Sequence, residues 1–506
     1  MTTTVKSATS DTSAASVESL VAEMLGQPWL IELFTELSER QEKSSAATAR
    51  LREVDASNHV FWPFHAPQFP LVATGAHGSR LTDADGNEYL DCHLGFGAQA
   101  LHGHSPEPVV EFVREQLAAT TGNGYCHPVE TKLVELLREF VPHCEKFAFL
   151  NSGTDATAAA IRIARAHTGR RMVAKFEGAL HGVHDLGMHN TAFWYHGHPA
   201  APFPGGAEDG GVERRPALTG IPVADPRDLL VLPNDPARAL ALIERHKDQL
   251  ACVLGEAVSS SFPYEEHTVP LIRSVAESCR GLRIPFILDE VLTGFRYGPG
   301  GAARHFGIPA DLCCYGKVIT GLGLPLSAVG GRAELLDHMQ TSGLPLTDIG
   351  RKTCVQTTHA GNHLSLCASY ASLKLLHEQG ETYYEETRAK VALIQRRLSA
   401  FRAETAIPLR LVGFGDFIGS FAFLEKESYA DYREFAAATN PIAFFLLTLM
   451  LRKRGFYTLS LPMLFTGGAH SVADLEAVCD AVTDSARELD GHGFPFVLPT
   501  AGGDET

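Results

Sequence analysis

Short apolar runs that end in polar or charged residues recur along the middle of the chain; they are residues 147–150, 251–255, 284–288 and 312–315. Runs of this length, with β-branched and aromatic side chains, are typical of strands that are covered on both faces. Helical segments alternate with them, such as Asp155–His167, which stops at Thr168-Gly169. The pattern predicts an α/β protein with a mostly parallel sheet.

The residues that follow these runs carry the candidate chemistry. Asp289 closes one predicted strand, and Lys317 follows another after a single glycine. Ligands of open α/β sheets bind at the carboxyl ends of the strands, where such side chains would meet. An acid and an amine, each at its own strand end, indicate a site that holds a charged aromatic cofactor through both groups.

Two stretches carry a family resemblance. Asp289-Glu-Val-Leu-Thr-Gly-Phe-Arg296 and Gly316-Lys-Val-Ile-Thr-Gly-Leu-Gly-Leu-Pro-Leu-Ser-Ala-Val-Gly-Gly-Arg332 resemble the core motifs of class III aminotransferases. These are pyridoxal-phosphate enzymes of fold type I, and the chain is most similar to their glutamate-1-semialdehyde aminomutase branch. The resemblance implies a large domain with a mostly parallel sheet and a smaller α+β domain built from both chain ends.

The resemblance also implies roles for individual residues. Lys317 would form the Schiff base with pyridoxal 5'-phosphate, because a lysine amine can form the bond and later move the proton. Asp289 would pair with the pyridinium nitrogen and keep it protonated, so that the ring withdraws electrons. Val291 would pack on one face of the ring.

A phosphate site is expected where the predicted strand 147–150 meets the helix that follows it. Backbone N–H groups and the helix dipole favour an anion there, and Ser152, Gly153 and Thr154 resemble the family's phosphate-binding turn. By itself the pattern favours an ordinary helix N-cap, and its position ahead of the Asp289 motif favours the phosphate site instead. Thr358 resembles the threonine that, in the family's homodimers, reaches the phosphate bound by the neighbouring subunit.

Three candidate positions differ from the family or keep two interpretations. Leu180 precedes His181 where relatives carry an aromatic residue, and loss of ring stacking costs about 0.5–1.5 kcal/mol. We therefore expect weaker retention of the cofactor, above all of pyridoxamine 5'-phosphate. His181 is a hydrogen-bonding residue near the ring or a structural histidine. Glu256 belongs to the network at the ring edge or is a structural buried acid.

Composition excludes several function classes. The net charge of -16 argues against a nucleic-acid partner. Ten cysteines without paired spacing indicate reduced thiols, and we expect Cys313 and Cys314 to serve core packing and no metal site to be present. No apolar segment marks a secretory signal near the N-terminus, and the apolar run Ile442–Leu451 is too short for a membrane span. A cytoplasmic protein without membrane contact is expected.

Four regions are predicted along the chain. Residues 1–58 form an N-terminal extension, disordered and then helical, with Leu20, Met24, Leu30, Leu33 and Leu37 at helical spacing. Residues 59–121 start the small domain with a hairpin that turns at 85–87. Residues 122–362 form the cofactor-binding domain, in which 194–222 is a long surface loop, and residues 363–506 complete the small domain.

The implied reaction is transamination. An amino acid or amine donates its amino group, the cofactor carries it as pyridoxamine phosphate, and an aldehyde or ketone accepts it; we favour a place in specialised metabolism. The alternatives are the aminomutase reaction itself, another pyridoxal-phosphate reaction such as racemisation or decarboxylation, and a non-enzymatic regulatory protein. Arg296 and Arg410 are candidates for a substrate carboxylate, and each has an ordinary salt bridge as its alternative.

Overall fold

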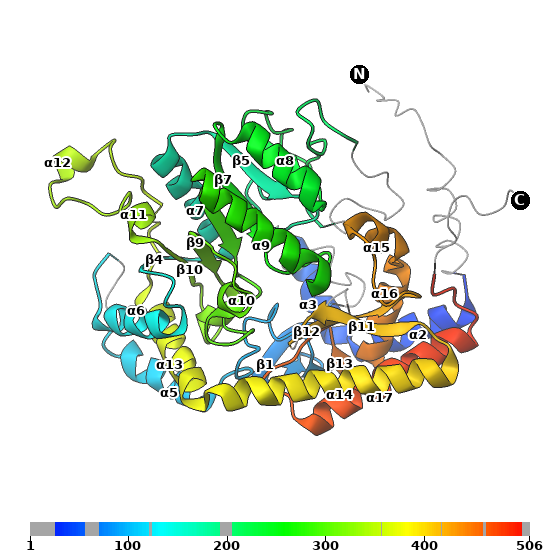
Figure 1. Ribbon diagram of the computed structural model, residues 1–506. Coiled ribbons are helices and arrows are strands. Elements are labelled where there is room, and N and C mark those ends of the chain that lie inside the picture. The colour runs from blue at the N-terminus through cyan, green and yellow to red at the C-terminus, as the bar shows by residue number, and fades with distance from the viewer. Residues whose placement is uncertain are drawn as a thin grey trace, which may run out of the picture.

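The computed structural model describes residues 26–55, 70–120, 124–192, 205–355, 357–415, 417–458 and 462–497. Within them the strands form three sheets, of which the largest is central to the upper part of the molecule in Figure 1. The predicted α/β architecture, with a mostly parallel large sheet and smaller sheets, is confirmed.

The large sheet has the order β4-β10-β9-β8-β7-β5-β6. Its strands are β4 Lys146–Leu150, β5 Met172–Phe176, β6 Leu229–Leu232, β7 Leu250–Glu256, β8 Phe286–Asp289, β9 Leu312–Tyr315 and β10 Ser327–Gly331. Neighbours from β6 to β9 run parallel, and β10 runs antiparallel to both β4 and β9. The four predicted strands are therefore present, and their carboxyl ends meet at one edge of the sheet.

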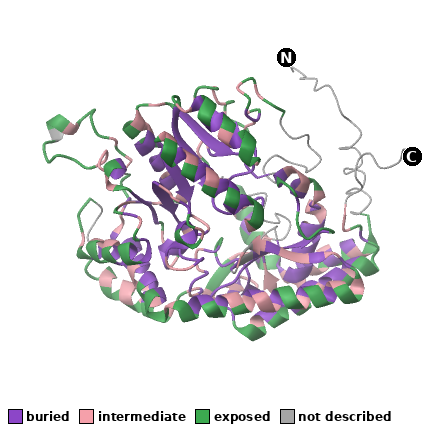
Figure 2. Cartoon of the chain, viewed as in Figure 1, coloured by how far each residue is buried: buried purple, intermediate pink, exposed green. Residues whose placement is uncertain are grey.

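Helices cover both faces of this sheet, which explains why its strands are continuous apolar runs. α7 (Gly153–Thr168) packs on one face against β7, β9 and β10, and α9 (Glu265–Leu282) packs against β7 and β8. Side chains that alternate along a strand consequently enter different cores: Cys313 joins the cluster of α9, and Cys314 that of α7. Figure 2 shows the sheet as the most continuous buried region.

The small domain uses both ends of the chain, as the family resemblance implied. β1 (Ala73–His77), β2 (Arg80–Asp83) and β3 (Glu88–Asp91) form an antiparallel sheet that β13 (Phe456–Tyr457) extends by pairing parallel with β3. The predicted hairpin is present, because the Asp83 carboxylate accepts hydrogen bonds from the backbone N–H groups of Asp85 and Asn87 in its turn. A third sheet has the order β11-β12-β14.

Helices complete the small domain. α2 contains Leu30, Leu33 and Leu37, all buried in one core with α16, so the helical part of the N-terminal extension is confirmed from residue 28. Leu20, Met24 and the residues expected to be disordered lie outside the described part. The elements not bounded above are α2 Pro28–Arg40, α3 Glu42–Arg52, α5 Glu107–Leu117, α6 Pro128–Phe140, α8 Pro236–His246, α10 Gly301–His305, η2 Lys317–Thr320, α11 Ala333–Leu336, α12 Pro345–Asp348, α13 His363–Gln379, α14 Glu381–Thr405, β11 Leu409–Phe414, β12 Ile418–Phe423, α15 Tyr432–Ala438, α16 Pro441–Lys453, β14 Met463–Phe465 and α17 Val472–Gly491.

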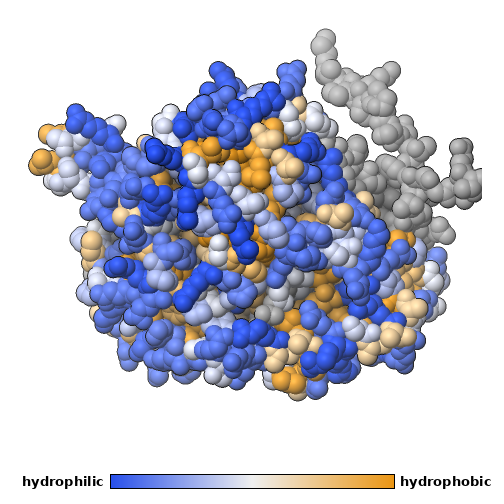
Figure 3. Space-filling model, viewed as in Figure 1, coloured by the Kyte–Doolittle hydropathy of each residue, from blue (hydrophilic) through white to orange (hydrophobic). Residues whose placement is uncertain are grey.

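The surface seen in Figure 3 is predominantly hydrophilic, with apolar residues in separate patches. Among the described helices none alone is long and apolar enough to span a membrane; α15 and α16 pass that test only as a pair, bent by 60°. The four region boundaries given above remain predictions.

Candidate active site

Three of the predicted site residues lie at neighbouring strand ends of the large sheet. Glu256 ends β7 and Asp289 ends β8, and the two are partners in the parallel register. Lys317 follows β9, the next strand in the sheet, after Gly316 alone. The sheet order thus brings together an amine and two carboxylates that are far apart in the sequence.

Asp289 and His181 form a buried pair. His181 Nδ1 lies 2.9 Å from Asp289 Oδ2, and both side chains are at most 6% exposed. A carboxylate can only accept, so Nδ1 carries the hydrogen and donates it. Burial lowers the pKa of His181 although Asp289 opposes the shift, which favours the neutral ring. The prediction of a hydrogen-bonding His181 is consistent with this geometry, and within the described part of the chain its buried Nε2 has no hydrogen-bond partner.

Lys175 holds the loop that carries His181, and sequence reasoning missed it. Its Nζ donates to the carbonyl oxygens of Ala179, Gly187 and His189 at 2.9, 3.0 and 2.5 Å. The side chain is 1% exposed, and burial lowers its pKa to about 7. A lysine inside the apolar run Met172–Phe176 was the signal that could have revealed it, because a buried amine needs several acceptors.

Lys317 begins η2 in a left-handed backbone conformation, with φ of 47°. This conformation is uncommon for residues other than glycine and often occurs at functional sites. The side chain is half-buried. Desolvation, followed by the charge of Arg296, lowers the pKa of Lys317 to about 8, whereas Asp289 and Glu256 oppose that shift. The amine is therefore closer to its neutral, nucleophilic form than an exposed lysine.

Glu256 has the opposite shift. Burial and then the charge of Asp289 raise its pKa to about 8, so at neutral pH the protonated acid is favoured. Its carboxyl oxygens accept hydrogen bonds from the backbone N–H groups of Leu180, at 3.2 Å, and Ser260, at 3.4 Å. Glu256 therefore fixes the backbone of Leu180, the position where an aromatic residue was expected, and Leu180 is itself half-buried.

Val291 stands between two glycines of the site. A Cβ on Gly153 would lie 3.0 Å from Val291 Cγ2, and one on Gly316 would lie 3.0 Å from Val291 Cγ1. The valine thus touches both the start of α7 and the residue before Lys317. This close approach is possible because neither position carries a side chain.

Ser152 is the N-cap of α7 and forms a capping box with Asp155. The N-cap interpretation is therefore correct, and phosphate binding by Ser152, Gly153 and Thr154 remains a prediction. The first N–H groups of a helix have no partner within it, and this end of α7 lies beside the strand ends of Asp289 and Lys317. Thr154 Oγ1 also accepts a hydrogen bond from Val183 N at 3.1 Å.

Thr358 is exposed in the turn before α13. Its neighbour Thr357 accepts a hydrogen bond from Asn151 Nδ2 at 2.7 Å, next to the start of α7 in the same chain. The segment is thus close to the predicted phosphate site. Whether Thr358 serves a neighbouring subunit stays a prediction, because a single chain is described.

The two candidate arginines differ. Arg296 is 5% exposed; its Nη2 donates to Gly97 O at 2.7 Å, while Nε and Nη1 are buried and have no hydrogen-bond partner among the described residues. Phe417 and Phe465 lie against it, with ring centres 5.7 and 5.5 Å from its Cζ. Arg410 instead donates to the carbonyl oxygens of Leu424 and Glu425. Only Arg296 shares the electrostatic neighbourhood of Lys317.

The predicted surface loop 194–222 is described only from residue 205. That part packs against the edge of the large sheet, where Val212 N donates to Val231 O of β6 at 2.9 Å. Residues 194–204 of the loop lie outside the described residues.

Known proteins resemble this chain over most of its length. Residues 63–439 match the family model described as aminotransferase class-III. The glutamate-1-semialdehyde 2,1-aminomutase of Thermomicrobium roseum is 33% identical over 422 residues, which are 83% of this chain and 90% of that protein.

Two solved structures add to this likeness. An omega-transaminase from Sphaerobacter thermophilus superposes with a TM-score of 0.79 at 27% identity, over 88% of this chain and 98% of the other. A β-phenylalanine aminotransferase from Variovorax paradoxus has a TM-score of 0.75 at 26% identity, over 92% and 97%. The chain therefore belongs to the class III aminotransferases and is a pyridoxal-phosphate-dependent enzyme of that family.

Proposed function

We propose that this enzyme moves an amino group from an amino-acid or amine donor to an aldehyde or ketone acceptor. The observation that carries the proposal is the pairing of Lys317, an amine with a lowered pKa, with the buried carboxylate of Asp289 on adjacent strands. Lys317 supplies the point of covalent attachment for pyridoxal 5'-phosphate. When bound, the cofactor withdraws electrons from the substrate carbon and carries the amino group between the two half-reactions.

The described residues fit this cofactor. Val291 is a half-buried aliphatic side chain between Gly153 and Gly316, and one face of the ring would pack on it. Gly153 and Thr154, at the start of α7, offer N–H groups to the phosphate. The Asp289 carboxylate, oriented by His181, would pair with the ring nitrogen and keep it protonated.

Lys317 also moves the proton. Its Nζ would take a proton from the substrate carbon and return it elsewhere, and a pKa near the operating pH suits both directions. Asp289 would stabilise the charge that develops during this transfer by keeping the ring nitrogen of the bound cofactor protonated. Lys175 acts indirectly, by holding the loop of His181.

We further propose a cytoplasmic homodimer in which Thr358 contacts the phosphate bound by the partner. In support, Leu344, Leu346 and Ile349 form an arm around α12 with exposed fractions of 63, 91 and 76%. The arm projects from the body of the molecule (Figure 1) and lies shortly before Thr358 in the sequence. Apolar residues exposed together are typical of an interaction surface.

The aminomutase reaction is the second candidate, because the curated relatives of comparable length carry that activity in their names. Leu180 and the additional helices α2 and α3 favour instead an aminotransferase of specialised metabolism. The two are separated by supplying glutamate-1-semialdehyde alone: an aminomutase converts it without a separate amino donor, and an aminotransferase does not. A donor and acceptor screen that detects amino-group transfer separates both from racemisation and decarboxylation.

Borohydride reduction of the holoenzyme followed by peptide mapping tests the proposal directly. The cofactor should be fixed to Lys317 alone, and Lys317→Ala should lose both the label and turnover. Lys146→Ala, a control at a partly exposed lysine that binds Asp337, should keep both. Label on another residue, or near-normal turnover of Lys317→Ala, would refute the assignment.

A further inference from the structure

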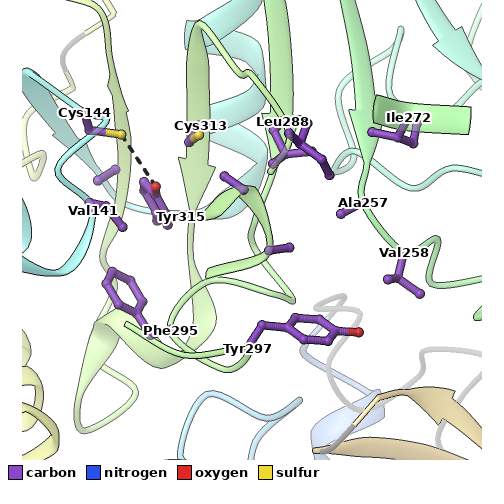
Figure 4. Close-up of a cluster of buried hydrophobic side chains, with 14 of the residues drawn as sticks. Val141, Cys144, Ala257, Val258, Ile272, Leu288, Phe295, Tyr297, Cys313 and Tyr315 are labelled. Atoms are coloured by element: carbon purple, nitrogen blue, oxygen red, sulfur yellow. Dashed lines mark hydrogen bonds between the residues drawn. The ribbon is translucent and has the colours of Figure 1, made fainter. Parts of the chain in front are cut away.

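Two cysteines and a histidine meet on the far side of β9 from α7. His143 and Cys144 lie in the turn between α6 and β4, and Cys313 lies in β9. The ligand atoms of the three side chains all lie within 4.8 Å of one another. Figure 4 shows Cys144 in the turn before β4 and Cys313 on β9, with the Tyr315 hydroxyl 3.6 Å from Cys144 Sγ.

The fold creates this cluster through a glycine. β10 runs between β4 and β9, and Gly330 of β10 is the register partner of both Phe147 and Cys313. A Cβ at Gly330 would lie 3.0 Å from Cys144 Sγ and 2.7 Å from Phe147 Cε1. The absent side chain therefore leaves the space over β10 through which Cys144 reaches toward Cys313.

The spacing suits a tetrahedral metal ion. Cys313 Sγ lies 3.6 Å from His143 Nε2. Zn–S and Zn–N bonds of about 2.3 and 2.0–2.1 Å at a tetrahedral angle place such ligand atoms about 3.5 Å apart. Both sulfurs belong to residues that are 1% exposed, and two thiolates would balance the charge of a divalent zinc ion in this buried place.

We propose that His143, Cys144 and Cys313 bind one Zn²⁺ ion, with the fourth position facing the Tyr315 hydroxyl. Binding displaces a proton from each thiol to solvent, and the neutral imidazole donates its Nε2 lone pair. The ion would connect the turn before β4 to β9. These two strands, β4 and β9, are not neighbours in the sheet. Since Lys317 follows β9, the site is structural support for the strand that presents the catalytic amine.

A disulfide between the same cysteines fits less well. Adjacent strands lie about 4.8 Å apart, so β4 and β9, separated by β10, are about 10 Å apart. A disulfide requires Cα atoms within about 7 Å of each other. Glu145, next to Cys144, donates its N–H to Gly331 O of β10, which holds the backbone on the far side of that strand. A metal ion can span this distance, because two metal–sulfur bonds then separate the sulfur atoms in place of one S–S bond.

The proposal departs from our expectation that Cys313 serves packing alone and that no metal site is present. No sequence pattern indicates a metal site, because His143 and Cys313 are 170 residues apart and neither belongs to a paired motif. Cys314, the adjacent residue, is equally buried but belongs to the core on the opposite face. It therefore offers a matched control on the same strand.

The test uses the holoenzyme equilibrated with Zn²⁺ and then passed through a desalting column. Wild type and Cys314→Ser should each retain about one ion per chain by elemental mass spectrometry, whereas Cys144→Ser and Cys313→Ser should fall to background. Zn²⁺ should also raise the thermal unfolding midpoint of wild type and Cys314→Ser and leave that of Cys144→Ser unchanged.

Co²⁺ provides a measurement that needs no variant. Wild type loaded with Co²⁺ should show the visible bands of tetrahedral thiolate coordination, at wavelengths beyond the cofactor absorbance. Three results would overturn the proposal: wild type that retains no zinc, zinc that survives in both Cys144→Ser and Cys313→Ser, or a disulfide between Cys144 and Cys313 in the isolated enzyme.

Discussion

His181 Nδ1 donates a hydrogen bond of 2.9 Å to Asp289 Oδ2, although the two residues are 108 positions apart in the sequence. Both side chains are buried, so the bond is protected from water and fixes the plane of the carboxylate. In the proposed function, the carboxylate held in this way would pair with the ring nitrogen of the cofactor. His181 is a positioning residue in this arrangement.

Replacing His181 with Leu should lower kcat by about 10–100-fold while KM changes by less than about threefold. The reason is that the Asp289 carboxylate loses its orientation, whereas the contacts of the substrate are kept. Steady-state kinetics at saturating cofactor measures both. His181→Asn, which keeps a donor, should recover part of kcat. His470→Gln replaces an equally buried histidine that bonds a backbone carbonyl in the small domain and should leave kcat near wild type. Equal losses at positions 181 and 470 would indicate a general effect of buried histidines.

Leu180 makes cofactor retention a second testable property. Leu180→Tyr should slow release of pyridoxamine phosphate by about 2–10-fold, because an aromatic stack contributes about 0.5–1.5 kcal/mol. Leu180→Met adds length without a ring and should release the cofactor as wild type does. Dialysis followed by absorbance gives the rate for each protein. Release that is identical in Leu180→Tyr and wild type would show that position 180 does not face the ring.

The sequence predicted the parts of this enzyme that are encoded locally. Apolar runs identified β4, β7, β8 and β9, and the residues just after them include Asp289 and Lys317. The reason is physical: a doubly covered strand needs a continuous apolar stretch, and its polar end marks the edge where ligands bind. The sheet order that brings those ends together was implied only by the family resemblance.

Features that depend on distant contacts were not predictable in this way. Lys175 looks like an intrusion in an apolar strand until the carbonyl oxygens of the following loop surround it. The pairing of β13 with β3 joins residues 456–457 to 90–91, and no local periodicity specifies that partner. The same holds for Cys144 and Cys313, whose contact depends on the missing side chain of Gly330.

Glu256 should make the cofactor-free protein less stable as pH rises. Its pKa is raised from 4.5 to about 8 by burial and by Asp289, so between these values the folded protein binds a proton that the unfolded chain has released. Stability conferred by the protonated acid is complete below pH 4.5 and lost as pH approaches about 8. Glu256→Gln mimics the protonated acid and should gain in unfolding midpoint relative to wild type as pH rises. A difference that is constant from pH 5 to 8 would contradict the raised pKa.

Arg296 should affect substrate choice more than stability. A buried guanidinium with Nε and Nη1 unpaired is costly for the folded state, so Arg296→Met should unfold at a temperature no lower than wild type. If a substrate carboxylate accepts hydrogen bonds from Nε and Nη1, loss of the guanidinium in Arg296→Met should lower kcat/KM for amino-acid donors by about 10–100-fold. Donors that lack a carboxylate should be affected far less. Uniform loss over both donor classes would assign Arg296 to packing.

Lys317 gives the sharpest pH dependence. An amine attacks an aldehyde only when it is unprotonated, and the pKa of Lys317 is lowered from 10.5 to about 8. The rate at which the cofactor-free protein captures pyridoxal phosphate should therefore level off above about pH 8 and fall about tenfold per pH unit below it.

The causes of the pKa shift of Lys317 predict that two variants move the midpoint of this pH profile in opposite directions. Arg296→Met removes a cation and should raise the midpoint, whereas Asp289→Asn removes an anion and should lower it. Stopped-flow absorbance measures the rates, with N-acetyl-lysine amide as a reference amine that titrates near its ordinary value. A wild-type midpoint at that ordinary value would mean that neither burial nor Arg296 acts on the amine, and the electrostatic account of the site would be wrong.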